Sequence, residues 1–214
     1  MKFKPVFAEF IGTAILAIAI VGSGIMGSTL SKDGGLSLFI NALGTAIGLA
    51  IAIRLVGKIS GAHLNPAVTL VMLLKNKISI GSALFYVLAQ ITGAISGVIT
   101  ANYIFGQQVI QSSTHNRDGA NLFVSEVIAT AILLWIILAN LDNFEKVATY
   151  VPIWIFGGIL FTSSTSFANP AITIGRSFTD SATGIAAGSI LLFVIAQIIG
   201  ALIGAGAAKV FKDE

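Results

Sequence analysis

The segments SGAHLNPAVTL (Ser60–Leu70) and SFANPAIT (Ser166–Thr173) carry the same unusual motif, so one kind of loop occurs twice in the chain. Both contain Asn-Pro-Ala followed by a β-branched apolar residue and a threonine. Asparagine is a good helix N-cap and proline is favoured at the first helical position, so each segment predicts a loop that becomes a helix at its asparagine. The predicted helices, over residues 65–74 and 169–178, are too short to cross a bilayer.

The rest of the chain repeats in the same order. Two further pairs of segments align: AEFIGTA (8–14) with SEVIATA (125–131), and FYVLAQITGAISG (85–97) with LFVIAQIIGALIG (192–204). In these alignments Glu9 corresponds to Glu126, and Gln90 corresponds to Gln197. Such self-similarity is the signature of an internal structural repeat.

The composition indicates that the natural solvent of this chain is lipid. Of the 214 residues, 56% are hydrophobic and only 10% are charged, whereas a soluble domain has about 25% charged residues. Six apolar stretches each approach the roughly 20 residues that a spanning helix needs. They cover residues 6–28, 36–57, 80–104, 121–141, 147–166 and 184–208. The first stretch resembles a signal peptide, but its length and Glu9 favour a retained span.

These features predict an all-α membrane protein with six transmembrane helices and two re-entrant half-helices. Residues 1–214 would form a single transmembrane channel domain, with repeat 1 over about 1–105, a polar linker over 106–120 and repeat 2 over about 121–214. Three spans is an odd number, so the second repeat enters the membrane from the opposite side, which makes an inverted 3+3 repeat. The half-helices should therefore start near the bilayer centre from opposite faces, lining a cavity.

The two predicted half-helix starts have an electrostatic consequence. Each helix N-terminus carries roughly half a positive charge, so two of them at mid-membrane oppose cations. The asparagine side chains can donate hydrogen bonds to a passing oxygen atom. The motifs therefore predict a narrow path for neutral hydroxylated solutes. The residues of the two motifs are Asn65, Pro66, Ala67, Asn169, Pro170 and Ala171. Two ordinary Asn-Pro turns are the alternative, which the duplication disfavours.

The distribution of basic residues predicts the orientation. With both termini in the cytoplasm, nine of the twelve lysine and arginine residues lie inside, as the positive-inside rule requires. The nine are Lys2, Lys4, Arg54, Lys58, Lys75, Lys77, Lys146, Lys209 and Lys212. Lys32, Arg117 and Arg176 would lie outside.

Composition also disfavours several other functions. The chain has no cysteine, and its only histidines are His63 and His115, so neither disulfides nor a metal site are expected. The basic residues are scattered singly, so nucleic acid is not an expected partner. No nucleophile–base pair or phosphate-binding loop is visible, so the sequence predicts neither an enzyme nor a cofactor. His115 lies in the polar linker and is expected to be solvated.

The two Asn-Pro-Ala motifs and the overall plan resemble the aquaporin (major intrinsic protein) family across essentially the whole chain. The resemblance implies the aquaporin fold, one pore per subunit, and usually a homotetramer. It further implies that Glu9 and Glu126 each accept hydrogen bonds from the re-entrant loop of their own half. A proton relay in a pump is the alternative for these glutamates. His63 would line the cytoplasmic side of the pore.

In this family four positions form the narrowest point, outside the Asn-Pro-Ala zone. The resemblance assigns them to Thr45, Gly157, Ser166 and Ile172, the first two by counting back from the asparagines. Most members have arginine at the position of Ile172, and this set matches neither the water-selective nor the glycerol pattern. We therefore expect a wide filter that passes water and glycerol-like polyols. Similar bacterial members without the arginine are linked to trivalent arsenic, so arsenous acid and other metalloid hydroxides are expected solutes, and the bacterial plasma (inner) membrane is the expected location.

Arg176 lies four residues after Ile172, one helical turn further out on the same face. It is predicted to line the outer vestibule and partly replace the missing charge, with pairing to Asp180 as the alternative.

Three alternative functions remain: a secondary active transporter of a small neutral solute, a strict water channel and a non-conducting junction protein. Inverted repeats with broken helices occur in transporters as well as in channels.

Overall fold

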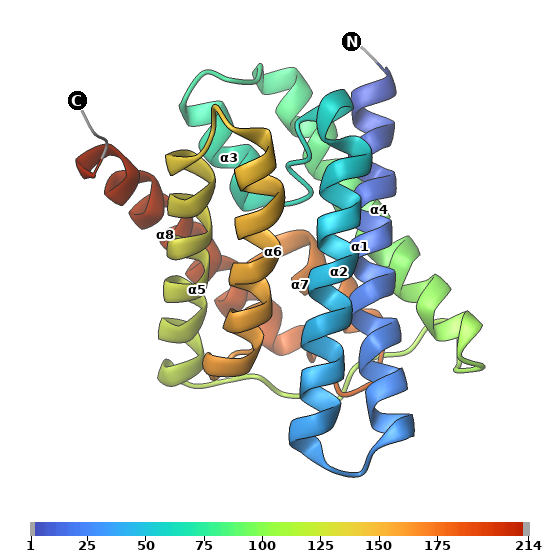
Figure 1. Ribbon diagram of the computed structural model, residues 1–214. Coiled ribbons are helices and arrows are strands. Elements are labelled where there is room, and N and C mark those ends of the chain that lie inside the picture. The colour runs from blue at the N-terminus through green and yellow to red at the C-terminus, as the bar shows by residue number, and fades with distance from the viewer. Residues whose placement is uncertain (1–2, 212–214) are drawn as a thin grey trace.

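The computed structural model describes residues 3–211, which form eight α-helices and two 3₁₀-helices (Figure 1). The long helices are α1 (Phe3–Leu30), α2 (Gly34–Ser60), α4 (Ile80–Ile104), α5 (Ala120–Ala139), α6 (Phe144–Phe161) and α8 (Ile190–Val210). The short ones are α3 (Pro66–Leu74), α7 (Pro170–Gly175), η1 (Arg176–Phe178) and η2 (Ala187–Ser189). No strand occurs within residues 3–211, and the predicted all-α class is confirmed.

The six long helices are apolar and long enough to cross a membrane. The outer face of α2 is suited to contact with lipid, because large apolar side chains recur there every fourth residue and are exposed. They are Leu43, Ile47, Ile51, Leu55 and Ile59. In water such a stripe would have to be buried, whereas lipid tails accept it as an outer surface. Six spanning helices with two half-helices therefore match the predicted architecture.

The two halves of the chain pack in corresponding ways. Helix α1 lies along α4, and its counterpart α5 lies along α8. Glycines permit both approaches: a Cβ atom at Gly93 would collide with the carbonyl oxygen of Phe10, and one at Gly200 would collide with that of Val127. Small residues at helix contacts are typical of membrane bundles, because they let backbones approach closely. Figure 1 shows α3 and α7 in the interior, one from each end of the bundle.

Several helix boundaries differ from those predicted. The sixth span, predicted from residue 184, begins as α8 at Ile190, after the 3₁₀-helix η2. The predicted fifth span, 147–166, ends at Phe161, because Thr165 and Ser166 adopt φ values of +60° and +47° that cannot continue an α-helix. The second half-helix, predicted over 169–178, is α-helical only to Gly175 and tightens into the 3₁₀-helix η1. Tightening of a last turn in this way is common at helix C-termini.

The polar linker between α4 and α5 is fixed by hydrogen bonds. The carbonyl oxygen of His115 accepts the N–H of Ala186 at 2.8 Å. Arg117 donates from Nε to the carbonyl oxygen of Gly184 at 2.8 Å and from Nη2 to that of Ala182 at 3.1 Å. Burial lowers the pKa of the Arg117 guanidinium below its usual range. The linker thus packs on the loop before α8, while the side chain of His115 is exposed, as expected.

Candidate functional site

A cavity of about 470 Å³ passes between the two halves of the protein. Lys77 and Asp142 line one end, and Asn41 and Arg176 line the other. The re-entrant loops form a polar wall, and the other walls carry apolar side chains one turn apart. These include Leu16, Ile20, Leu49, Ile53, Leu133, Ile137, Val151 and Ile155. A solute at the level of these apolar side chains can therefore hydrogen-bond on one side only.

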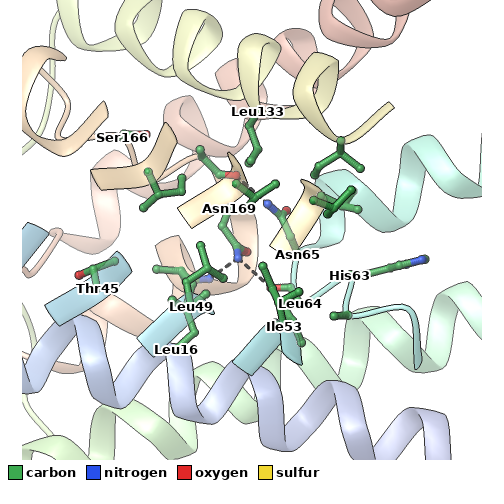
Figure 2. Close-up of a pocket in the computed structure, with 18 of the residues that line it drawn as sticks. Leu16, Thr45, Leu49, Ile53, His63, Leu64, Asn65, Leu133, Ser166 and Asn169 are labelled. Carbon is green, nitrogen blue, oxygen red and sulfur yellow. Dashed lines mark hydrogen bonds between the residues drawn. The ribbon is translucent and has the colours of Figure 1, made fainter. Parts of the chain in front are cut away.

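Asn65 and Asn169 meet in the middle of the cavity (Figure 2). Nδ2 of Asn65 donates to the carbonyl oxygen of Ala168 at 2.7 Å, and Nδ2 of Asn169 donates to that of Leu64 at 2.8 Å. Each Oδ1 atom caps its own helix by accepting the amide N–H two residues further on, at 2.9 and 3.0 Å. Because a side-chain amide has two N–H groups, one on each asparagine is left for a solute.

The two re-entrant loops share an unusual backbone. Ala62 and Leu64 have φ values of +48° and +49°, and the corresponding residues Ser166 and Ala168 have +47° and +46°. Left-handed conformations at residues other than glycine cost of order 1–3 kcal/mol each and persist only where the surroundings hold them. They carry the loop backbone along the cavity wall, which these four residues line.

Glu9 holds the first loop. Its Oε1 accepts the Ser60 hydroxyl at 2.6 Å and the N–H of His63 at 2.9 Å. Its Oε2 accepts the N–H of Leu64 at 2.6 Å and Nε2 of Gln90 at 2.8 Å. The side chain is completely buried, and four donors compensate for its removal from water. A carboxylate occupied in this way has no free position for a relayed proton.

Glu126 makes the corresponding contacts in the second half. It accepts the N–H groups of Phe167 at 2.8 Å and Ala168 at 2.9 Å, and Nε2 of Gln197 at 2.7 Å. Gln197 also donates to Thr173 of α7 at 2.8 Å. The same three-part arrangement of glutamate, loop amides and glutamine therefore occurs twice, as the repeat predicts.

His63 lies on the cavity wall, on the other side of the asparagines from Thr45 and Ser166 (Figure 2). Its Nδ1 lies 3.1 Å from the hydroxyl of Thr69, and its ring meets that of Tyr86 edge to face at 5.3 Å. Within the described chain no group of three or more histidine, cysteine or acidic side chains could hold a metal ion.

Three of the four predicted filter residues line the cavity. Thr45, Ser166 and Ile172 are 2%, 4% and 2% exposed. The hydroxyl oxygens of Thr45 and Ser166 have no hydrogen-bond partner among the described residues. A buried hydroxyl without a partner costs about 1–3 kcal/mol. Both oxygens are inaccessible here, and that of Ser166 lies against Gly158, so each side chain must rotate to present its hydroxyl to a solute.

The fourth, Gly157, does not line the cavity. A Cβ atom there would face the ring of Phe161 in its own helix, 2.7 Å away. The face of α6 that reaches the cavity carries Ile155 and Ile159, and Gly158 instead backs Ser166.

Arg176 lines the end of the cavity, where it is 5% exposed. Its Nε donates to the carbonyl oxygen of Thr183, and its guanidinium carbon lies 3.3 Å from the centroid of the Phe167 ring. The alternative partner, Asp180, accepts the N–H and hydroxyl of Thr114 at 2.7 and 2.9 Å instead. Arg176 is therefore held at the cavity and not by an ion pair with Asp180.

Asn41 is a cavity residue that the sequence reasoning missed. It lies four residues before Thr45, on the same face of α2, and is 9% exposed. The signal was present in the sequence, because a lone amide inside an apolar span is by default a candidate functional residue.

Residues 1–168 match the family model described as Major intrinsic protein. The chain belongs to the major intrinsic protein family. This major intrinsic protein is 40% identical over 196 residues to aquaglyceroporin AqpS of Rhizobium meliloti, an alignment that covers 91% of this chain and 84% of that protein. It is 31% identical over 189 residues to aquaporin-5 of Mus musculus, covering 81% of this chain and 68% of that protein.

The fold of this major intrinsic protein is similar to that of the aquaglyceroporin from Plasmodium falciparum, with a TM-score of 0.78. The two chains are 23% identical, and the superposition covers 95% of this chain and 93% of the other. Family membership confirms the predicted class of function, a passive membrane channel for water and small solutes, and the family is one of channels and not of enzymes.

Proposed function

We propose that the protein conducts water together with small uncharged polyhydroxylated solutes, and that the cavity is the permeation path. The observation that carries this proposal is the outer half of the cavity, which Thr45, Ser166 and Ile172 line, with isoleucine at the position where arginine was expected. The names of relatives such as aquaglyceroporin AqpS support the same class of solute.

The filter in this proposal consists of Thr45, Ser166, Ile172 and, from α6, Ile159. On rotation of their side chains, the two hydroxyls bind the hydroxyl groups of a solute, and the two isoleucines contact its carbon skeleton. Glycerol has both kinds of surface. Arsenous acid and related metalloid hydroxides are neutral and carry several hydroxyls, so the same filter accepts them.

Cations are excluded by the centre of the path. The asparagines Asn65 and Asn169 present N–H groups there, and the starts of α3 and α7 add partial positive charge. Neither Glu9 nor Glu126 lines the cavity, and both accept hydrogen bonds from the re-entrant loops. A cation would lose its hydration shell without finding replacement ligands.

Stopped-flow light scattering on proteoliposomes tests the proposal with water, glycerol, urea and arsenous acid as separate solutes. We expect rapid flux of all four, with a low activation energy. Rapid water flux without glycerol or arsenous acid flux would identify a strict water channel and refute the wide filter. Ile172→Arg should reduce glycerol flux more than water flux, because it adds bulk and charge at the constriction.

Kinetics separate the channel from a secondary active transporter. Channel flux does not saturate with solute concentration and does not respond to a proton or sodium gradient. A transporter requires coupling groups at mid-membrane, and the buried glutamates hydrogen-bond the loops and do not line the cavity. Gradient-driven accumulation of glycerol would contradict the channel proposal.

We also propose a homotetramer in a bacterial plasma membrane, with both termini in the cytoplasm. The family supports the tetramer, and the positions of lysine and arginine support the orientation; Lys2 and Lys212 lie outside the described residues. Since the chain has no cysteine, single cysteines at Lys77 and at Arg117 would report which side each loop faces. Native mass spectrometry would report the number of subunits.

A further inference from the structure

Two polar side chains lie one helical turn outside the proposed filter. Asn41 precedes Thr45 by four residues in α2, and Arg176 follows Ile172 by four residues at the start of η1. Both line the cavity. Helix α2 runs inward toward the filter and α7 runs outward from it, so a residue four before Thr45 and one four after Ile172 lie at a similar depth.

Thr183 joins the two side chains. Arg176 donates from Nε to its carbonyl oxygen. Its methyl group occupies the space over Gly24, where a Cβ atom would collide with it and would lie 3.5 Å from Nδ2 of Asn41. Asn41 and Arg176 therefore flank the same residue of the loop that precedes α8.

Each of the two side chains is oriented by the protein and leaves one kind of group free. Asn41 donates from Nδ2 to the carbonyl oxygen of Ile20 at 2.7 Å and to the Ser23 hydroxyl at 3.0 Å. Its Oδ1 accepts no hydrogen bond from the described residues and is left as an acceptor. Arg176 stacks on Phe167 and uses Nε on Thr183, which leaves its terminal nitrogens as donors.

We propose that Asn41 and Arg176 form a binding site for a hydroxyl-bearing neutral solute at the outer end of the path. A solute hydroxyl donates its proton to Oδ1 of Asn41, and the same or an adjacent hydroxyl accepts from a terminal N–H of Arg176. Because a hydroxyl group is both donor and acceptor, the pair prefers polyols over solutes of similar size that lack adjacent hydroxyls. This inference rests on the proposed channel function and adds the residues that select the solute.

The fixed charge of Arg176 also acts on ions. It repels metal cations before they reach the asparagines. Arg117 adds a second positive charge nearby, because its guanidinium carbon lies 4.9 Å from the centroid of the same Phe167 ring. Arg176 thus supplies, one helical turn further out, the positive charge that is absent at Ile172.

The test compares Arg176→Gln and Asn41→Met with matched controls that lie away from the cavity. Arg54→Gln and Asn140→Ala are suitable, because Arg54 bonds the carbonyl oxygen of Ala148 and Asn140 bonds that of Ile136. Glycerol, urea and water permeabilities are measured on the same proteoliposomes. We expect each cavity variant to lower the glycerol-to-urea ratio about five- to tenfold, as expected for one lost hydrogen bond, and the controls to leave it unchanged.

Ratios measured on one sample are independent of the fraction of folded channel, and Arg176→Lys gives a second variant that keeps the charge. Wild-type protein without glycerol flux would refute the proposed function itself. Wild-type glycerol flux with unchanged ratios in Arg176→Gln and Asn41→Met would refute only this inference. Formate flux that is present in the wild type and lost in Arg176→Gln would identify an anion site and would also overturn it.

Discussion

Replacing Glu9 by alanine should release the first re-entrant loop. The N–H groups of His63 and Leu64 would lose their acceptor. An unsatisfied buried N–H costs about 1–3 kcal/mol, so the pair lowers the free energy of unfolding by about 2–6 kcal/mol. The left-handed conformations of Ala62 and Leu64 then relax, which moves the carbonyl oxygen that Asn169 binds.

The milder change Glu9→Gln tests the loss of a single hydrogen bond to the loop. Glutamine keeps one oxygen but places an NH₂ group against a backbone donor, so one N–H is left unsatisfied and the loss is about 1–3 kcal/mol. Glu126→Gln should lose a similar amount, because the second half has the same contacts. Glu145→Gln is the control: its ion pair with Arg54, at 3.6 Å, is exposed and contributes roughly 0–1 kcal/mol.

The assay combines two measurements on each variant. The fraction of monodisperse protein that survives heating in detergent reports stability, and water permeability per folded channel reports the path. We expect both heat stability and water permeability to decrease from the wild type to the Gln variant and from the Gln variant to the Ala variant. If Glu9→Ala were as heat-stable and as permeable as the wild type, the carboxylate would not hold the loop. If Glu9→Gln kept both properties but lost a response to a pH gradient, a proton relay would be the better account.

Three further predictions follow from other contacts. Gly93→Val should lower heat stability strongly, because its side chain would meet the backbone of α1, whereas Gly81→Val, where no atom lies within 4 Å, should not. Thr45→Val should raise heat stability by removing an unpaired buried hydroxyl and should lower glycerol flux relative to water. Hydrogen bonds from Thr114 hold the pKa of Asp180 below its usual 3.8. A lowered carboxyl pKa stabilises the fold above the ordinary pKa and loses this effect as pH falls through the lowered value. Amide exchange in the linker, corrected for intrinsic rate, should therefore stay slow at neutral pH and accelerate only below pH 3.8.

The duplicated motif made most of the fold predictable. Asn65 and Asn169 cap their helices as expected from local chemistry, and the long apolar stretches became the spanning helices. The end of α6 at Phe161 was not predictable, because the loop that follows it takes up left-handed conformations without any glycine. Glu126, which is distant in sequence, holds that loop in place. The residues of the loop alone therefore do not predict its conformation.

The site was predictable where the repeat pairs its members and unpredictable where long-range packing decides. Glu9 could be assigned from its counterpart in the second half. The environment of Arg176 could not, since Phe167 and Thr183 reach it from separate loops. Gly157 was assigned by counting alone, and counting does not fix which face of a helix reaches a cavity.

The reciprocal hydrogen bonds of Asn65 and Asn169 make the joint between the halves self-complementary. Each half offers one amide donor and one carbonyl acceptor, and the other half uses both. This is the geometry of an isologous dimer contact, so the chain is organised as a dimer whose two protomers have been fused through a linker. Two copies of a single half, inserted in opposite orientations, would already carry every group that this joint requires.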